Sequence, residues 1–401
     1  MRTRQHRLWP CLVLVSVVLL PVLVSAHGPE EQAATLGAVD PVFFSGWQVW
    51  VHLLAQWMHL LGLPLWFGVL VAAGVFRILA LETLLFAGWA VLLLQGVTGA
   101  YNLEYGAGIP TVPSLLQWPL VAAYDFGRSY TAVLGVKQGL YGLAVLVTLL
   151  VTALHLSRAP QAHRTRLRRG YLAAQITLGS LIALATAGVL LLHEAADLAP
   201  TPLHALGGVM GPDGQAMSPP VEVLPDPYRR QALTSIAAGW HLLRQPRVWL
   251  DLASRVVHLL GFGLWLGAVA VATAHPALPL GRFLAYSWLW LGVQLLSGVV
   301  QMAVATPFAV SPYVWNVGVL HHVRFGWTYT LLMAIKHGLV LGIVGVTGRL
   351  TLWHRAAVRR GDLAKGATNR WLHAANLALG LAIAWVMIML LLVHEGVDHA
   401  L

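Results

Sequence analysis

Two histidines inside long apolar segments are the residues whose chemistry most needs an explanation. His59 precedes Trp66 by seven residues. The same spacing separates His258 from Trp265. Residues seven apart lie on one face of a helix, and imidazole binds transition metals or haem iron. The alternative is structural, with each histidine hydrogen-bonded to a neighbouring backbone carbonyl.

Further polar residues accompany each histidine. His52 lies seven residues before His59 and extends the first stripe, whereas Asp251 occupies that position in the second half. Lys137 and Lys336 lie within later apolar segments, about ten residues from the segment ends. Because lipid offers a charge no partner, we expect each lysine to have an interior anionic or carbonyl partner. Such lysines either bind anionic groups or cap a structural network.

A His-Glu-x-x-Asp sequence closes each half of the chain. If the helix continues through it, the histidine and the aspartate are four residues apart and share a face. Imidazole with carboxylate suits a divalent metal, and the alternative is an ordinary charged helix end at the membrane surface. The residues are His193, Glu194 and Asp197 in the first half, and His394, Glu395 and Asp398 in the second.

The first 26 residues have the features of a secretory signal peptide. Basic residues precede an apolar stretch, and Val24-Ser25-Ala26 offers small residues for cleavage. Cleavage there makes His27 the first residue, whose amine and imidazole together chelate Cu(II). The alternative is an uncleaved anchor. The only cysteine, Cys11, lies in this segment, so the mature chain would lack the thiols that disulfides and iron–sulfur clusters require.

The composition is that of a membrane protein. Of 401 residues, 58% are hydrophobic and only 10% are charged, whereas soluble domains carry about 25% charged residues. The net charge of +10 does not indicate nucleic-acid binding, because the basic residues concentrate in two loops and so mark the cytoplasmic side. These residues are Arg158, Arg164, Arg166, Arg168 and Arg169 in one loop, and Arg355, Arg359, Arg360, Lys365 and Arg370 in the other.

Eight segments are long enough to cross the hydrocarbon core, which takes about 20 apolar residues. With the mature N-terminus outside a bacterial inner membrane, both arginine-rich loops are cytoplasmic and the C-terminus is periplasmic. We therefore expect an all-α, multi-pass membrane protein. The segments are approximately 48–75, 80–102, 127–154, 171–193, 249–275, 283–304, 326–350 and 371–394.

The second four segments repeat the first four. His59 to Gly68 aligns with His258 to Gly267 at an offset of 199 residues, and a two-residue slip in the basic loop then aligns His193 with His394. Each copy has an even number of spans, so we expect two parallel repeats about a pseudo-twofold axis along the membrane normal. The expected parts are the signal peptide 1–26, a periplasmic segment 27–47, the first four-helix repeat 48–194, a periplasmic loop 195–247 and the second repeat 248–401.

The His-x6-Trp-x-Gly helix, with a lysine-bearing third helix in the same unit, resembles the copper-resistance protein D (CopD) family. The resemblance covers most of residues 48–401 in layout. It implies an inner-membrane protein of eight helices that handles copper, often beside a periplasmic copper-binding partner of the copper-resistance protein C type. The stretches that carry it are His59 to Gly68, Phe126 to Lys137, His258 to Gly267 and Phe325 to Lys336.

Three functions are compatible with these residues. We expect a copper-binding protein that passes copper across the membrane or to a partner, with His59 and His258 relaying the ion between the halves. The alternative is a haem b-binding electron-transfer subunit of a respiratory complex, in which the two histidines are axial ligands. The third is an assembly or scaffold protein with structural histidines. No nucleotide-binding or nucleophile motif occurs in a suitable context, so we do not expect an enzyme.

Overall fold

The computed structural model describes thirteen parts of the chain, and within them the protein is helical apart from one pair of two-residue strands. The described residues are 47–105, 115–116, 118–122, 126–157, 161–197, 209–210, 216–217, 237, 244, 246–275, 278–304, 326–361 and 370–399. The predicted signal peptide and His27 lie outside them.

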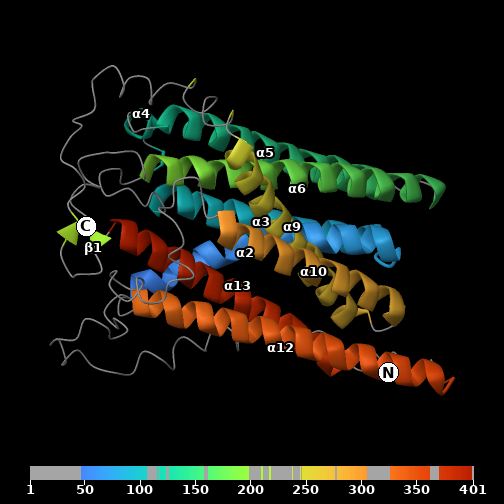
Figure 1. Cartoon of the computed structure of the whole chain (residues 1–401). Coiled ribbons are helices and arrows are strands. Elements are labelled where there is room, and N and C mark those ends of the chain that lie inside the picture. The colour runs from blue at the N-terminus through green and yellow to red at the C-terminus, as the bar shows by residue number, and fades with distance from the viewer. Residues whose placement is uncertain are drawn as a thin grey trace.

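Eight described helices are long and apolar enough to cross a membrane, which confirms the expected all-α membrane protein. Such helices satisfy every backbone hydrogen bond internally, as the bilayer interior requires. They are α2 (Trp47–Phe76), α3 (Leu81–Tyr105), α5 (Gly127–Leu156), α6 (Gln161–Asp197), α9 (Pro246–Ala274), α10 (Leu280–Val304), α12 (Gly326–Arg359) and α13 (Arg370–His399). Figure 1 shows them side by side in one bundle.

The helix contacts follow the internal repeat. In the first repeat α2 packs against α3 and α5 against α6, and in the second α9 packs against α10 and α12 against α13. Between the repeats, α2 packs on α9, α6 on α9 and α13 on α2. The contacts α6–α9 and α13–α2 are reciprocal, as a pseudo-twofold axis between α2 and α9 requires.

Glycines let α2 and α9 approach closely at this axis. A Cβ atom on Gly68 would collide with the backbone carbonyl of Gly263, and one on Gly267 would collide with the backbone at Gly68. Gly263 itself lies against Pro64, its counterpart in the first repeat. Association of helices in lipid relies on such close backbone packing, because lipid tails are as apolar as the side chains.

The arginine-rich segments are largely helical, which corrects their assignment as loops. The helix α6 begins at Gln161 and α12 continues to Arg359, so both extend beyond the expected segments. Arginine is a good helix former, and its charge is solvated outside the hydrocarbon. The arginines therefore extend these helices instead of ending them. Gly361 ends the second extension with a φ of 67°, a conformation that favours glycine.

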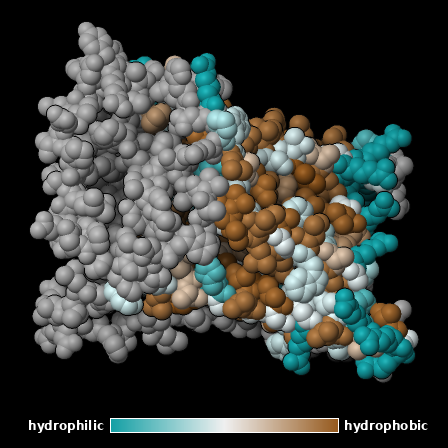
Figure 2. Space-filling view, viewed as in Figure 1, coloured by the Kyte–Doolittle hydropathy of each residue, from teal (hydrophilic) through white to brown (hydrophobic). Residues whose placement is uncertain are grey.

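One end of the bundle carries these arginines. It is the end where α5 meets α6 and α12 meets α13, and we call it the arginine-rich end. Arg168 also secures the neighbouring end of α2 there, because its Nε donates to the carbonyl of Leu79 at 2.8 Å and its Nη2 to that of Ala73 at 2.9 Å. Figure 2 shows hydrophobic surface across the middle of the bundle and hydrophilic residues towards this end.

Short elements lie towards the opposite end. The single-turn helix α4 (Trp118–Val121) lies between α3 and α5. Gly127 then starts α5 so close to it that a Cβ atom would collide with the carbonyl of Val121. Between α6 and α9, β1 (Val209–Met210) pairs antiparallel with β2 (Ala216–Met217).

Candidate functional site

His59 is held by a hydroxyl on the neighbouring helix α3. Its Nδ1 lies 3.1 Å from Thr98 Oγ1. The same hydroxyl donates its only hydrogen to the carbonyl of Leu94 at 2.7 Å. Thr98 therefore accepts from His59, which places the imidazole proton on Nδ1 and leaves the lone pair of Nε2 for another partner.

His258 has the equivalent arrangement in the second repeat. Its Nδ1 lies 2.9 Å from Ser297 Oγ on α10. Ser297 donates to the carbonyl of Val293 at 2.7 Å, so its oxygen also accepts from the imidazole. The position keeps a hydroxyl while changing residue type. Matching identical residues across the repeat missed Thr98 and Ser297 for that reason.

A glutamine and a glycine complete the setting of each imidazole. Gln95 Nε2 donates to the backbone carbonyl of His59 at 2.7 Å, and Gln294 donates likewise to that of His258. Gly99 provides room for the first ring, because a Cβ atom there would lie 3.2 Å from His59 Cε1. Gly298 stands in the same relation to His258, at 3.5 Å. The recurrence of these pairs in the sequence is thereby explained.

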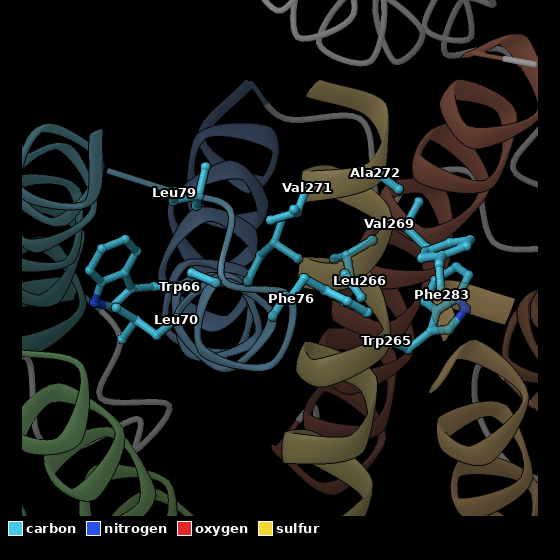
Figure 3. Close-up of a cluster of buried hydrophobic side chains, with 14 of the residues drawn as sticks. Trp66, Leu70, Phe76, Leu79, Trp265, Leu266, Val269, Val271, Ala272 and Phe283 are labelled. Carbon is cyan, nitrogen blue, oxygen red and sulfur yellow. The ribbon is translucent and has the colours of Figure 1, made fainter. Parts of the chain in front are cut away.

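The two histidines face different sides of the central α2–α9 contact. Gly68 of α2 packs on α9, whereas His59, nine residues earlier, contacts α3. Nine residues at about 100° each make two and a half turns, so the two residues lie on opposite faces of α2. Trp66 and Trp265 accordingly lie on opposite sides of the α2–α9 pair in Figure 3. The structure therefore holds two separate sites, one in each repeat.

Each histidine has a lysine of its own repeat nearby. The charge of Lys137 on α5 acts on His59, and that of Lys336 on α12 acts on His258. Among the described residues, no carboxylate lies within ion-pair distance of either lysine. Of the expected anionic or carbonyl partner, the described residues therefore supply no carboxylate.

The stripe of His52, His59 and Trp66 runs along α3, as their shared face predicted. The ring of His52 lies 6.0 Å from that of Tyr101, and Trp66 lies beside Gly88. Trp66 and its counterpart Trp265 are 4% and 1% exposed. The indole Nε1 of each has no hydrogen-bond partner among the described residues.

The stripe positions of the two repeats differ at the end opposite the arginines. In α2, His52 Nε2 lies 3.3 Å from Gln56 Nε2. In α9 the same two positions hold an ion pair, with Arg255 Nε 2.8 Å from Asp251 Oδ2. Asp251 is only 2% exposed. The first repeat therefore has an imidazole at this position, whereas the second has a carboxylate that is already paired with an arginine.

The helices continue through both His-Glu-x-x-Asp sequences. The helix α6 includes Asp197 and α13 reaches His399, so each histidine and aspartate are one helical turn apart along the backbone. The side chains of His193, Glu194, Asp197, His394, Glu395 and Asp398 lie outside the described residues. Metal binding there stays a prediction.

No group of three or more His, Cys, Asp or Glu side chains that could hold a metal ion occurs within the part of the chain that the structure describes. The described histidine sites therefore offer one imidazole each. A metal at either site requires further ligands from a substrate, water or undescribed residues.

No protein-family model matches the chain, and no match was found among curated proteins or solved structures. Its fold and its sites define the class by themselves. The chain is a multi-pass, all-α membrane protein with a duplicated, lysine-flanked histidine site.

Proposed function

We propose that this protein binds copper within the membrane and passes it across the membrane or to a partner. The observation that supports this proposal is the hydrogen bonding of His59 to Thr98 and of His258 to Ser297, from which we infer that the imidazole proton lies on Nδ1. A histidine that donates through Nδ1 presents Nε2 as a metal ligand, and an outer hydrogen bond of this kind raises its basicity. Imidazole nitrogen suits copper.

The proposal places the protein in a bacterial inner membrane, with a periplasmic partner of the copper-resistance protein C type. The resemblance of the His-x6-Trp-x-Gly stretches to the copper-resistance protein D family supports this choice. His27, His52 and the paired His-Glu-x-x-Asp ends would collect the ion. Since His59 and His258 lie in separate sites on opposite sides of the α2–α9 contact, each repeat would provide its own route, without the expected relay from one histidine to the other.

The lysines favour a second candidate, a haem b electron-transfer subunit. A cation beside each imidazole disfavours a bare metal ion and favours an anionic group, such as a haem propionate. His59 contacts α3 and His258 contacts α10, on faces turned away from the α2–α9 contact, which argues against one haem held between them. This candidate therefore requires a haem within each repeat, with a second axial ligand of another kind.

A visible spectrum and a metal analysis of one detergent-purified sample separate the two candidates. Copper binding predicts a sample without a Soret band, with up to two copper ions per chain in proportion to the two sites. His59→Ala should remove one of these ions and His59→Ala with His258→Ala both. A Soret band lost in the double variant would establish the haem candidate instead.

His337→Ala is the matched control. His337 lies on α12, is exposed on the bundle and is bonded to the carbonyl of Met333 at 2.7 Å. Its replacement should leave copper content unchanged. Equal copper loss in His337→Ala and His59→Ala would contradict the assignment of the site.

A further inference from the structure

The second repeat contains buried polar atoms for which no other described residue supplies a hydrogen-bond partner. Ser287 and Asn376 are each 1% exposed, and neither Ser287 Oγ nor Asn376 Oδ1 has a hydrogen-bond partner in the described residues. The same holds for His373 Nδ1 and Trp265 Nε1. Together these atoms comprise donors and acceptors from α9, α10 and α13.

Contacts between rings bring these residues to one place. His373 packs edge-on against Phe283 of α10, with ring centroids 4.9 Å apart. Ser287 and Asn376 follow these two residues by about one turn on helices that both run away from the arginine-rich end. Phe283 also lies beside Trp265 in Figure 3. We call Trp265, Ser287, His373 and Asn376 the polar cluster.

The first repeat lacks the polar cluster. Gly88 stands at the position of Ser287, and Leu172 at that of His373. Gln175 stands at the position of Asn376 and is longer by one methylene. It donates to both the carbonyl of Ala144 and Thr148 Oγ1, each at 2.9 Å. Asn376 donates only to Thr347 Oγ1, at 3.1 Å.

Leaving these atoms unsatisfied is energetically unfavourable. Each buried donor or acceptor without a partner loses the hydrogen bonds that it would make in water, and the membrane interior offers no compensation. Proteins meet such groups with buried water, which makes about three hydrogen bonds to polar atoms. The cluster combines acceptors and donors without a fixed charge, which suits water better than an ion.

We propose that the second repeat holds a hydrated pocket at the polar cluster, and that the first repeat has none. Within the second repeat, the polar cluster lies nearer the arginine-rich end than His258 does, because Trp265 follows His258 by seven residues on a helix that runs towards that end. The proposal concerns water alone and does not depend on which cofactor the histidine sites bind.

Thiol accessibility tests the proposal directly. With Cys11→Ser the chain has no other cysteine, so each variant introduces a single thiol: Ser287→Cys in the polar cluster, and as control Leu172→Cys, at the buried first-repeat position that corresponds to His373. A thiol reacts as the thiolate, which water stabilises. Ser287→Cys should therefore react with a small charged methanethiosulfonate at least about ten-fold faster than Leu172→Cys. Equal slow rates would overturn the proposal. Reaction of Ser287→Cys with a lipophilic maleimide alone would show lipid access and also overturn it.

A measurement on the unchanged protein covers the case in which a variant fails to fold. Radiolysis produces hydroxyl radicals from bound water, and these oxidise the aromatic residues beside it. The two buried tryptophans, Trp265 and Trp66, form a matched pair within one chain. Faster oxidation of Trp265 is the expected result, and equal oxidation of the two would overturn the proposal.

Discussion

The two repeats are alike at mid-membrane and different at their ends. Both hold a histidine against a hydroxyl, with a glutamine bonded to the histidine carbonyl. Both also join their second and third helices, through Trp89 to Thr152 at 3.1 Å and Trp288 to Thr351 at 2.9 Å. Divergence after duplication thus spared the histidine sites and the bonds that hold the surrounding helices.

At the ends of the repeats, by contrast, equivalent positions hold neutral groups in one repeat and charged groups in the other. Opposite the arginines, the first repeat has His52 with Gln56 and the second has Asp251 with Arg255. At the arginine-rich end, Glu82 pairs with His155 at 3.4 Å. Gly281 takes the place of Glu82 in the second repeat and lies beside His354. Two similar histidine sites therefore lie in repeats whose ends differ in charge.

The largest effect is expected from breaking the ion pair of the second repeat. Arg255→Gln leaves the buried carboxylate of Asp251 without this cation and should destabilise the protein by about 3 kcal/mol. Titration with a denaturing detergent measures the change. The control is Gln56→Ala at the equivalent position, expected to cost less than about 1 kcal/mol.

Adding Asp251→His to Arg255→Gln recreates the His–Gln pair of the first repeat. It should recover most of the lost stability, because both charges are then gone. A double variant as unstable as Arg255→Gln would show that the ends are not exchangeable between the repeats.

The close contact between the repeats provides the next test. Gly68→Ala drives a methyl group into the backbone of α9 and should cost about 2–3 kcal/mol, because backbone cannot move aside as a flexible side chain can. Gly74→Ala in the same helix meets no atom within 4 Å and should be neutral or stabilising. Similar melting temperatures for the two variants would contradict the glycine contact.

A smaller change should separate the two histidine sites. Thr98→Val removes the oxygen that orients His59 and should weaken metal binding at the first site about ten-fold. Ser297→Ala should do the same to the second site alone. Isothermal titration with both variants would resolve the sites, and a loss at both sites from either variant would refute their independence.

The smallest effect is expected at the arginine-rich end. Glu82→Gln removes an ion pair with His155 whose carboxylate is half-exposed, so the change should be about 0.5 kcal/mol or less. It should shrink further at high salt, since exposed charges are screened. A salt-independent loss above about 1 kcal/mol would indicate a buried role for this pair.

The eight helices, their duplication and the face on which each histidine lies follow from the amino-acid sequence alone. These features depend on local periodicity and on the length of apolar segments, which follow from the backbone geometry of a single helix. Continuation of α6 and α13 through the His-Glu-x-x-Asp sequences was left open, since the expected apolar segments end at 193 and 394, and the structure shows it. The helical arginine-rich segments do not follow from the length of apolar segments, because arginine continues a helix without being apolar.

The residues that each helix face contacts, by contrast, depend on how the helices pack together. The hydroxyl partners Thr98 and Ser297, the opposite directions of His59 and His258 and the polar cluster all depend on contacts between helices far apart in the chain. In lipid, hydrophobicity does not distinguish one helix face from another, so these contacts are selected by close packing and hydrogen bonding. Periodicity along one helix contains no information about its neighbour.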